Sequence, residues 1–202
     1  MSRVLAYLVN AVPYMLCALP VYLPLRIFYR LRTRDRWQTT FWHELGLGLL
    51  VLFAVGVASQ TVIPKLEFGQ GTLGIVNQNL AGRLNLIPGM LFVDLYRECV
   101  VNGYFLYFVL NVLGNLGLFL PIGFALPLLW RRMTGGRALL IALGASLCIE
   151  LGQLFQARGC DIDDLWLNVL GAWMGWGLYR LLAHAAPLRP LREAFWMKPA
   201  VH

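Results

Sequence analysis

Hydrophobic and polar positions are separated along this chain into long apolar blocks and shorter polar connections. Five blocks are almost entirely apolar and contain about 20 residues or more, the length that a helix needs to cross the hydrocarbon core of a bilayer. They run approximately over residues 5–29, 42–63, 104–130, 138–157 and 165–185. We therefore expect an all-α integral membrane protein with about five transmembrane helices.

The composition supports this interpretation, because 59% of the 202 residues are hydrophobic and only 13% are charged. A soluble domain carries about 25% charged residues. A chain of this length has no room for a separate soluble module. We expect one transmembrane domain over residues 1–202, in which the first two spans form a helical pair over about residues 5–63.

The net charge of +7 does not indicate nucleic acid binding, because the basic residues form short clusters between the apolar blocks. These clusters lie within residues 30–36, 131–137 and 180–198, after the first, third and fifth blocks. A multi-pass protein keeps such clusters in the cytoplasm. The N-terminus is therefore expected outside the membrane and the C-terminus in the cytoplasm, with outer loops over residues 64–103 and 158–164.

The connection over residues 64–103 is unusually long, and such connections often contain local structure or carry function. Residues 84–96 mix apolar and polar side chains. We expect a short amphipathic helix there on the outer membrane face, with Pro88 near its start. The alternative is a re-entrant segment between the spans, where surrounding protein would bury its backbone.

Three apolar blocks contain polar residues at helical spacing, so that each pair shares one helix face. The pairs are Asn111 with Asn115, Glu150 with Gln153, and Asp164 with Asn168. A rise of about 1.5 Å per residue places Asn111, Glu150 and Asn168 in the outer half of the membrane. Nearby glycines would let these helices approach closely; they are Gly114, Gly117, Gly171 and Gly175.

Charged groups at membrane depth are costly and by default indicate a functional site. The sequence thus predicts a small polar pocket open to the outside. Glu150 would lie at its floor, and its rim would be formed by Arg158, Asp161, Asp163 and Asp164.

Each of these residues also has a structural interpretation. Asp163 or Asp164 can cap the fifth helix, because a carboxylate accepts from free N–H groups at a helix N-terminus. The asparagines can form hydrogen bonds between helices. Glu150 can pair with Arg158 or Arg83.

Two of the four cysteines, Cys99 and Cys160, fall in the expected outer loops, where a disulfide can persist. The alternative is two unrelated thiols, because the sequence does not determine the distance between them.

Three segments carry recognisable motifs. The first is Asn-Leu-Ile-Pro at residues 85–88, and the second is Asn-Val-Leu-Gly-Asn followed by Phe-Leu-Pro-Ile-Gly within residues 111–123. The third covers residues 150–171, beginning with Glu-Leu-Gly-Gln and ending with Asn-Val-Leu-Gly. Together they resemble the VanZ-like family of bacterial membrane proteins. The resemblance covers a core of about residues 84–182 well, and the first two spans only by general character.

The resemblance implies a multi-pass protein of the bacterial inner (cytoplasmic) membrane. The founding member of the family accompanies glycopeptide-resistance genes and gives low-level resistance to teicoplanin. Together with the polar residues at helical spacing, the motifs give the candidate binding residues: Asn85, Asn111, Asn115, Glu150, Gln153, Arg158, Asp161, Asp163, Asp164 and Asn168.

Three functions are compatible with these residues. The first is a cell-envelope protein that binds a lipid or lipid-linked cell-wall component in the outward-facing pocket, where Arg158 and Arg83 could contact phosphate. The second is an intramembrane enzyme on a lipid-linked substrate. The third is a proton- or ion-coupled carrier with Glu150 as the titrating group, although no internal repeat supports it.

The enzyme hypothesis has two forms. Two carboxylates could divide acid and base roles, with the catalytic candidates Glu150, Asp161, Asp163 and Asp164. Alternatively, Asp161, Asp163 and Asp164 could hold Mg²⁺ or Ca²⁺, which favour carboxylate oxygens. We expect no other cofactor, and the expected partner is a membrane lipid or lipid-linked envelope intermediate rather than nucleic acid.

Overall fold

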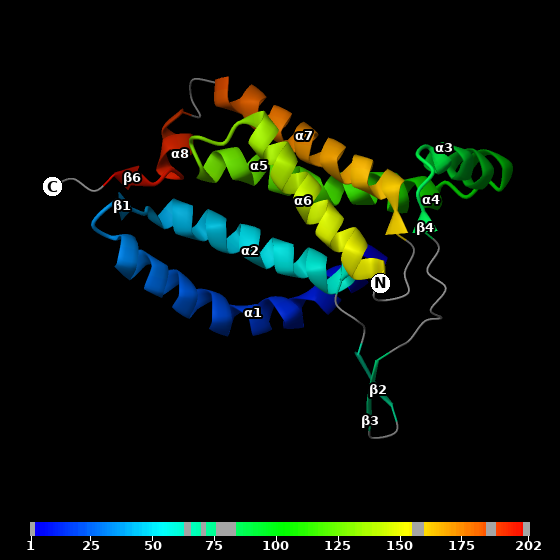
Figure 1. Ribbon diagram of the computed structural model, residues 1–202, viewed down its shortest axis with the longest axis horizontal. Helices are drawn as coiled ribbons and strands as arrows, with labels where there is room; N and C mark the ends of the chain where they lie inside the picture. Colours follow the sequence, from blue (N-terminus) through cyan, green and yellow to red (C-terminus); the bar gives the residue numbers. More distant parts are fainter. Residues whose placement is uncertain are drawn as a thin grey trace.

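The computed structural model describes residues 3–62, 66–69, 72–75, 84–154, 160–184 and 189–199. Its long elements are all helices, which confirms the all-α fold class. Strands occur only as short pairs within the described part. Figure 1 shows two groups of long helices, α1 with α2 and α5 with α6 and α7.

The N-terminal helical pair is formed by α1 (Arg3–Thr33) and α2 (Phe41–Thr61). The two helices run antiparallel beside each other, and α1 curves along its length (Figure 1). Three prolines inside α1 remove backbone hydrogen bonds and account for this curvature. Thr40 caps α2, because its hydroxyl accepts from the His43 amide at 3.1 Å.

The second group consists of α5 (Gly114–Leu129), α6 (Gly135–Leu154) and α7 (Ile162–His184). Its core contains Phe119, Ala142 and Ala172, which are buried between the three helices. α5 and α7 are in the closest contact, because glycines allow their backbones to meet. A Cβ at Gly171 or Gly175 would collide with a carbonyl oxygen of α5.

The prediction for these two glycines is therefore confirmed, but the prediction for the two on the facing helix is wrong. A Cβ at Gly117 would meet no atom within 4 Å, and one at Gly114 would make only ordinary contact. The close approach on the α5 side occurs at Gly123 instead, where a Cβ would collide with the Ala172 backbone.

The long connection begins with a hairpin of β2 (Leu66–Gly69) and β3 (Thr72–Ile75), which the sequence pattern does not predict. It continues through β4 (Leu84–Asn85) to α3 (Met90–Leu95) and the π-helical segment η1 (Tyr96–Val101). The expected short helix is thus present, starting two residues after Pro88. Its position on the membrane face stays a prediction.

The third apolar block forms one continuous helical rod, in which α4 (Leu106–Phe108) and the π-helical segment η2 (Val109–Leu113) lead into α5. Four helical stretches are long and apolar enough to cross a membrane: Val9–Thr33, Phe41–Thr61, Leu106–Leu129 and Gly135–Gln153. The chain is therefore a multi-pass membrane protein. The fifth block forms α7, which has 23 residues but includes Asp163, Asp164 and Asn168, so a fifth span stays a prediction.

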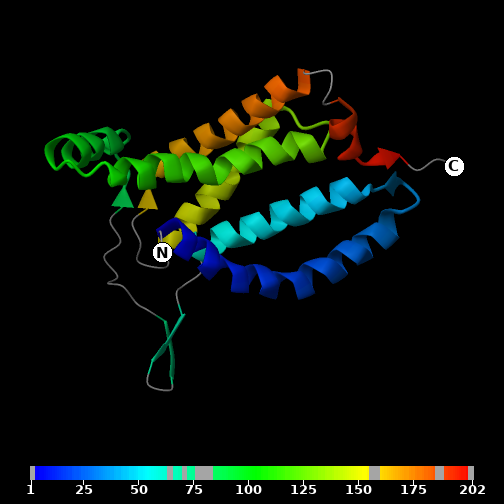
Figure 2. The ribbon, with the colours of Figure 1, turned by 180° about the vertical axis from the view of Figure 1, so that it is seen from behind.

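The three basic clusters lie at the same end of the molecule. β1 (Trp37–Gln38), after the first cluster, pairs with β6 (Lys198–Pro199). The turn between α5 and α6 and the short α8 (Arg189–Ala194) lie at this end as well (Figures 1 and 2). This arrangement agrees with the expectation that the three basic clusters share one side of the membrane. The orientation of the protein in its membrane stays a prediction.

Candidate functional site

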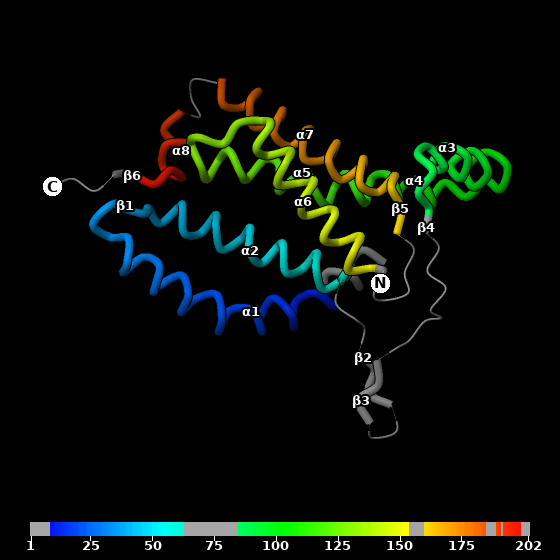
Figure 3. Tube along the Cα trace, viewed as in Figure 1, coloured from blue at the N-terminus to red at the C-terminus, as the bar shows by residue number. Residues whose placement is uncertain are grey.

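Four carboxylates lie close together at the end opposite to the basic clusters, and we call them the acidic cluster: Glu150, Asp161, Asp163 and Asp164. They come from α6, from β5 (Cys160–Asp161) and from the first turn of α7. β5 pairs in parallel with β4, so that Asn85 lies opposite Asp161. Figure 3 shows β5 at the start of α7 beside β4.

Asp161 joins these two segments. One of its carboxylate oxygens accepts from the Asp163 amide at 2.9 Å, and the Asn85 side chain donates to both of its oxygens at 3.1 Å. Because Asp161 directly precedes α7, the bond to Asp163 is an N-terminal cap. The prediction that Asp163 or Asp164 caps this helix is therefore corrected, because Asp161 occupies the capping position.

Asp163 caps a different helix. Its two oxygens accept from the amides of Gly89 and Leu91, each at 2.8 Å, at the N-terminus of α3. Gly89 has a left-handed conformation with φ of 89°, which presents its amide without a side-chain clash. Asp163 is only 6% exposed, so these bonds lie away from solvent. The acidic segment thus fastens the short helix α3 to the start of α7.

Glu150 is 5% exposed and accepts from the Asp161 amide at 3.1 Å. The thiol of Cys160 lies beside it. Burial and the neighbouring Glu150 carboxylate raise the pKa of this thiol above its ordinary value. None of the described lysines, arginines and histidines forms an ion pair with the acidic cluster.

The predicted amides divide into two groups. Asn115 reaches the acidic cluster and donates to Asp164 at 2.6 Å across the α5–α7 contact. Asn111 instead donates to the Tyr107 carbonyl oxygen of its own helix at 3.0 Å, so the structure does not bring it to the cluster.

A further polar contact lies deeper along α7. Buried Asn168 donates to the hydroxyl of Ser146 at 2.9 Å, while its own oxygen has no hydrogen-bond partner among the described residues. The side-chain oxygen of Gln153 is buried without a donor in the same described part. Ser146 was missed in the sequence, although its position four residues before Glu150 places it on the same face of α6.

Two interactions that the sequence left open, a disulfide and a metal site, are not seen among the described residues. Cys99 and Cys160 are both free thiols, so the bridge between them is not formed. Cys99 lies on η1 and faces the Tyr104 carbonyl, whereas Cys160 faces Glu150. In the described ranges, no three histidine, cysteine or acidic side chains are placed to hold a metal ion. The predicted rim residue Arg158, like Arg83, lies outside the described residues.

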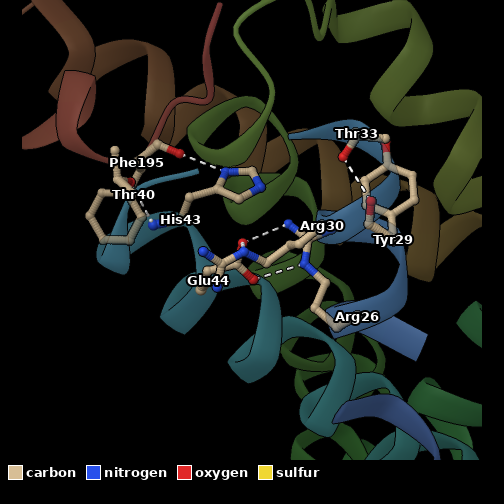
Figure 4. A network of polar contacts seen from close by, with 8 residues as sticks. All are labelled: Arg26, Tyr29, Arg30, Thr33, Thr40, His43, Glu44 and Phe195. Carbon is tan, nitrogen blue, oxygen red and sulfur yellow. Dashed lines mark hydrogen bonds and ion pairs between the residues drawn. The ribbon is translucent and has the colours of Figure 1, made fainter. Parts of the chain in front are cut away.

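The basic end contains a polar network that the sequence did not reveal (Figure 4). The Arg26 guanidinium donates to both oxygens of Glu44 at 2.8 and 3.0 Å, which joins α1 to α2. The Nδ1 of buried His43 lies 2.8 Å from the carbonyl oxygen of Phe195, and Thr40 donates to the Ala194 carbonyl. These contacts fasten the segment after α8 to the start of α2.

Comparison with known proteins identifies the family of this chain. Neither the curated proteins nor the solved structures include a significant match. The family model described as VanZ/LLP1 matches residues 47–183. The match includes α5, α6, all of α7 except its last residue, and every member of the acidic cluster. Since it covers more than half of the sequence, the chain belongs to the VanZ/LLP1 family.

Proposed function

We propose that this VanZ-like envelope protein binds a lipid or lipid-linked cell-wall component from the outer side of the bacterial inner membrane. The head group would lie against the acidic cluster together with Gln153 and Asn168. Its hydroxyl, amide or ammonium groups would donate hydrogen bonds to these side chains.

The observation that carries the proposal is an excess of buried acceptors over donors among the described residues at this end. The oxygens of Gln153 and Asn168 lack donors among the described residues, and no described cation pairs with the acidic cluster. A buried acceptor without a partner costs about 1–3 kcal/mol. A sugar or peptide head group would supply the missing donors, whereas a phosphate alone would not.

The test measures binding to the purified protein in lipid nanodiscs. The probes are an undecaprenyl diphosphate that carries a disaccharide and undecaprenyl phosphate without sugar. We expect the wild type to prefer the sugar-bearing lipid. Gln153→Leu and Asn168→Leu should each lower this affinity about tenfold, because each removes an acceptor worth roughly one hydrogen bond.

Each leucine substitution removes an unpaired oxygen, and Asn168→Leu also removes the bond to Ser146, so thermal unfolding of both variants verifies that they are folded. A matched control is Asn102→Ala, which removes an exposed outer amide bonded to Glu98. Equal affinity of the wild type and both leucine variants for the disaccharide lipid would refute the proposal.

The family also suggests a link to teicoplanin resistance, which we include in the proposal. The chain should raise the inhibitory concentration of teicoplanin when it is expressed in a susceptible bacterium, and Glu150→Gln should reduce that increase. No difference between cells with and without the chain would exclude resistance in that host.

A second candidate is a carboxylate-dependent enzyme on a lipid-linked substrate, because the acidic cluster contains two buried carboxyl groups, Glu150 and Asp163. Glu150→Gln keeps the shape of the side chain and removes its capacity as a base. An enzyme would lose nearly all turnover, whereas a binding protein would lose only part of its affinity. Mass spectrometry of envelope lipids incubated with both forms distinguishes these results.

A further inference from the structure

A cavity of about 540 Å³ lies at the basic end, between the turn that joins α5 to α6, the end of α7, and α8. We call it the basic cavity. Four arginines and two tryptophans contribute to its lining: Arg131, Arg132, Arg180, Arg192, Trp176 and Trp196. It lies at the other end of the helices from the acidic cluster, and its residues belong to none of the sites described above.

No carboxylate in the described part of the protein neutralises the four arginines. None of the acidic side chains that the structure describes forms an ion pair with them. Of the carboxylates at this end, Glu44 holds Arg26 and Arg30, and Asp35 contacts Arg34. Glu193 on α8 forms no ion pair with a described residue.

Aromatic rings hold three of these guanidinium groups in place. Arg131 and Arg192 both lie over the ring of Trp196, at 5.4 and 5.0 Å from its centroid, and Arg180 lies 5.5 Å from that of Trp176. Such stacking leaves the edges of a guanidinium group available for hydrogen bonds.

Two donors of the same lining are buried without an acceptor. They are the Nε of Arg192 and the indole Nε1 of Trp196, which have no partner among the described residues. The general preference of arginines for the cytoplasmic loops of membrane proteins explains their presence at this end. That preference does not explain why the arginines line one cavity and leave hydrogen-bond donors unused. A cavity of this kind suits an anionic ligand.

A second, apolar cavity of about 220 Å³ adjoins the first. It shares Tyr179, Ala183 and Arg192 with the basic cavity, and its remaining lining is hydrocarbon: Phe124, Leu128, Leu182 and Phe195. An anion site that continues into an apolar site matches an amphiphile, in which a phosphate group is joined to hydrocarbon.

We propose that the basic cavity binds the phosphate of an anionic membrane phospholipid, whose hydrocarbon lies against the adjoining apolar cavity. Basic pockets between spans on the cytoplasmic side are suited to phosphorylated head groups. Arg132 and Arg180 bind the phosphate at the mouth of the cavity, and Arg192 lies at the boundary between its polar and apolar parts.

The test compares lipid binding by the full-length protein in detergent, using native mass spectrometry. The probes are phosphatidylglycerol, phosphatidylcholine and inorganic phosphate. We expect phosphatidylglycerol to bind at least tenfold more tightly than phosphatidylcholine. The double variant Arg132→Gln/Arg180→Gln should lower the affinity for phosphatidylglycerol about tenfold, because each arginine near a lipid phosphate contributes several-fold.

The matched control is Arg32→Gln/Arg36→Gln, which removes two exposed charges at the same end and should leave the affinity unchanged. Equal losses in both double variants would mean general attraction to basic charge and would overturn the proposal. Absence of any preference for phosphatidylglycerol would overturn it as well.

Leu182→Ser distinguishes a lipid from free phosphate. It should weaken phosphatidylglycerol binding and leave the weak binding of inorganic phosphate unaffected. If inorganic phosphate bound as tightly as phosphatidylglycerol, and Leu182→Ser changed neither, the occupant would be a free anion and the lipid proposal would be wrong. Exposed Arg132, Arg180 and Leu182 can be replaced without opening the core, and thermal unfolding of each variant verifies its fold.

Discussion

Asp163→Asn should release the short helix α3 while leaving the long helices folded. Both oxygens of Asp163 accept from α3 amides, and hydrogen bonds to a charged group contribute about 1.5–3 kcal/mol each. Asparagine has one acceptor oxygen, so one bond is lost and the other becomes a neutral bond of about 1 kcal/mol. The expected loss is therefore about 2–5 kcal/mol from the local stability of residues 86–101.

Hydrogen–deuterium exchange of the full-length protein measures this loss directly, because the Gly89 and Leu91 amides are the donors themselves. A loss of about 2 kcal/mol corresponds to about thirtyfold faster exchange, since each 1.4 kcal/mol is a factor of ten. Peptides from α5 and α6 should exchange as in the wild type.

The control for this experiment is Asp94→Asn, which removes the same charge from α3 itself. Asp94 pairs with Arg97 at 3.3 Å, and the side chain of Arg97 is 64% exposed. An exposed pair of this kind contributes less than about 1 kcal/mol, so exchange should rise less than about fivefold. If Asp163→Asn accelerated exchange no more than Asp94→Asn, the carboxylate would not hold α3, and this explanation of the acidic motif would be refuted.

Three further predictions address packing, thiol reactivity and the basic end. Gly175→Ala should lower the melting temperature by several degrees, because its Cβ would collide with the Leu120 carbonyl oxygen. The control Gly177→Ala should change it little, because no atom lies within 4 Å of its Cβ. Equal melting temperatures of the two variants would contradict the packing of α5 against α7. The raised pKa of the Cys160 thiol means less thiolate at neutral pH, so maleimide should label it slowly; Glu150→Gln should lower that pKa and speed labelling. Glu44→Gln should lower the free energy of unfolding by about 1–3 kcal/mol, since it removes a part-buried partner of two arginines, and an unchanged denaturation midpoint would show that the pair contributes nothing.

The helices and much of the candidate site could be predicted because both depend on periodicity along one segment. The length of an apolar block determines a helix, and spacing of three or four residues determines which polar groups share its face. This reasoning puts Asn115 and Glu150 in one polar layer, and Asn115 does reach the acidic cluster that contains Glu150. It cannot place Asn111, because an amide in a helix can bond to its own backbone as well as to a neighbouring helix.

The contacts that the sequence does not reveal connect residues far apart in the chain. Asp163 caps a helix that begins more than seventy residues earlier, and any analysis along the chain would assign it to its own helix. The Arg26–Glu44 pair was missed for the same reason, because these side chains meet only when two antiparallel helices pack against each other. Gly123 was missed because a glycine shows close approach only when the facing backbone is known.

The structure also separates the candidate binding residues by the use of their oxygens. Asp161 accepts from the Asp163 amide and caps α7, and Asp163 accepts from two amides and caps α3, so both aspartates are already engaged in holding these segments together. Gln153 and Asn168 retain buried acceptors without donors among the described residues. Ligand contacts should therefore come from these two amides. Substituting the aspartates should change exchange in α3 more than binding, and substituting the amides should change binding more than exchange, so the opposite pattern would assign the ligand to the aspartates.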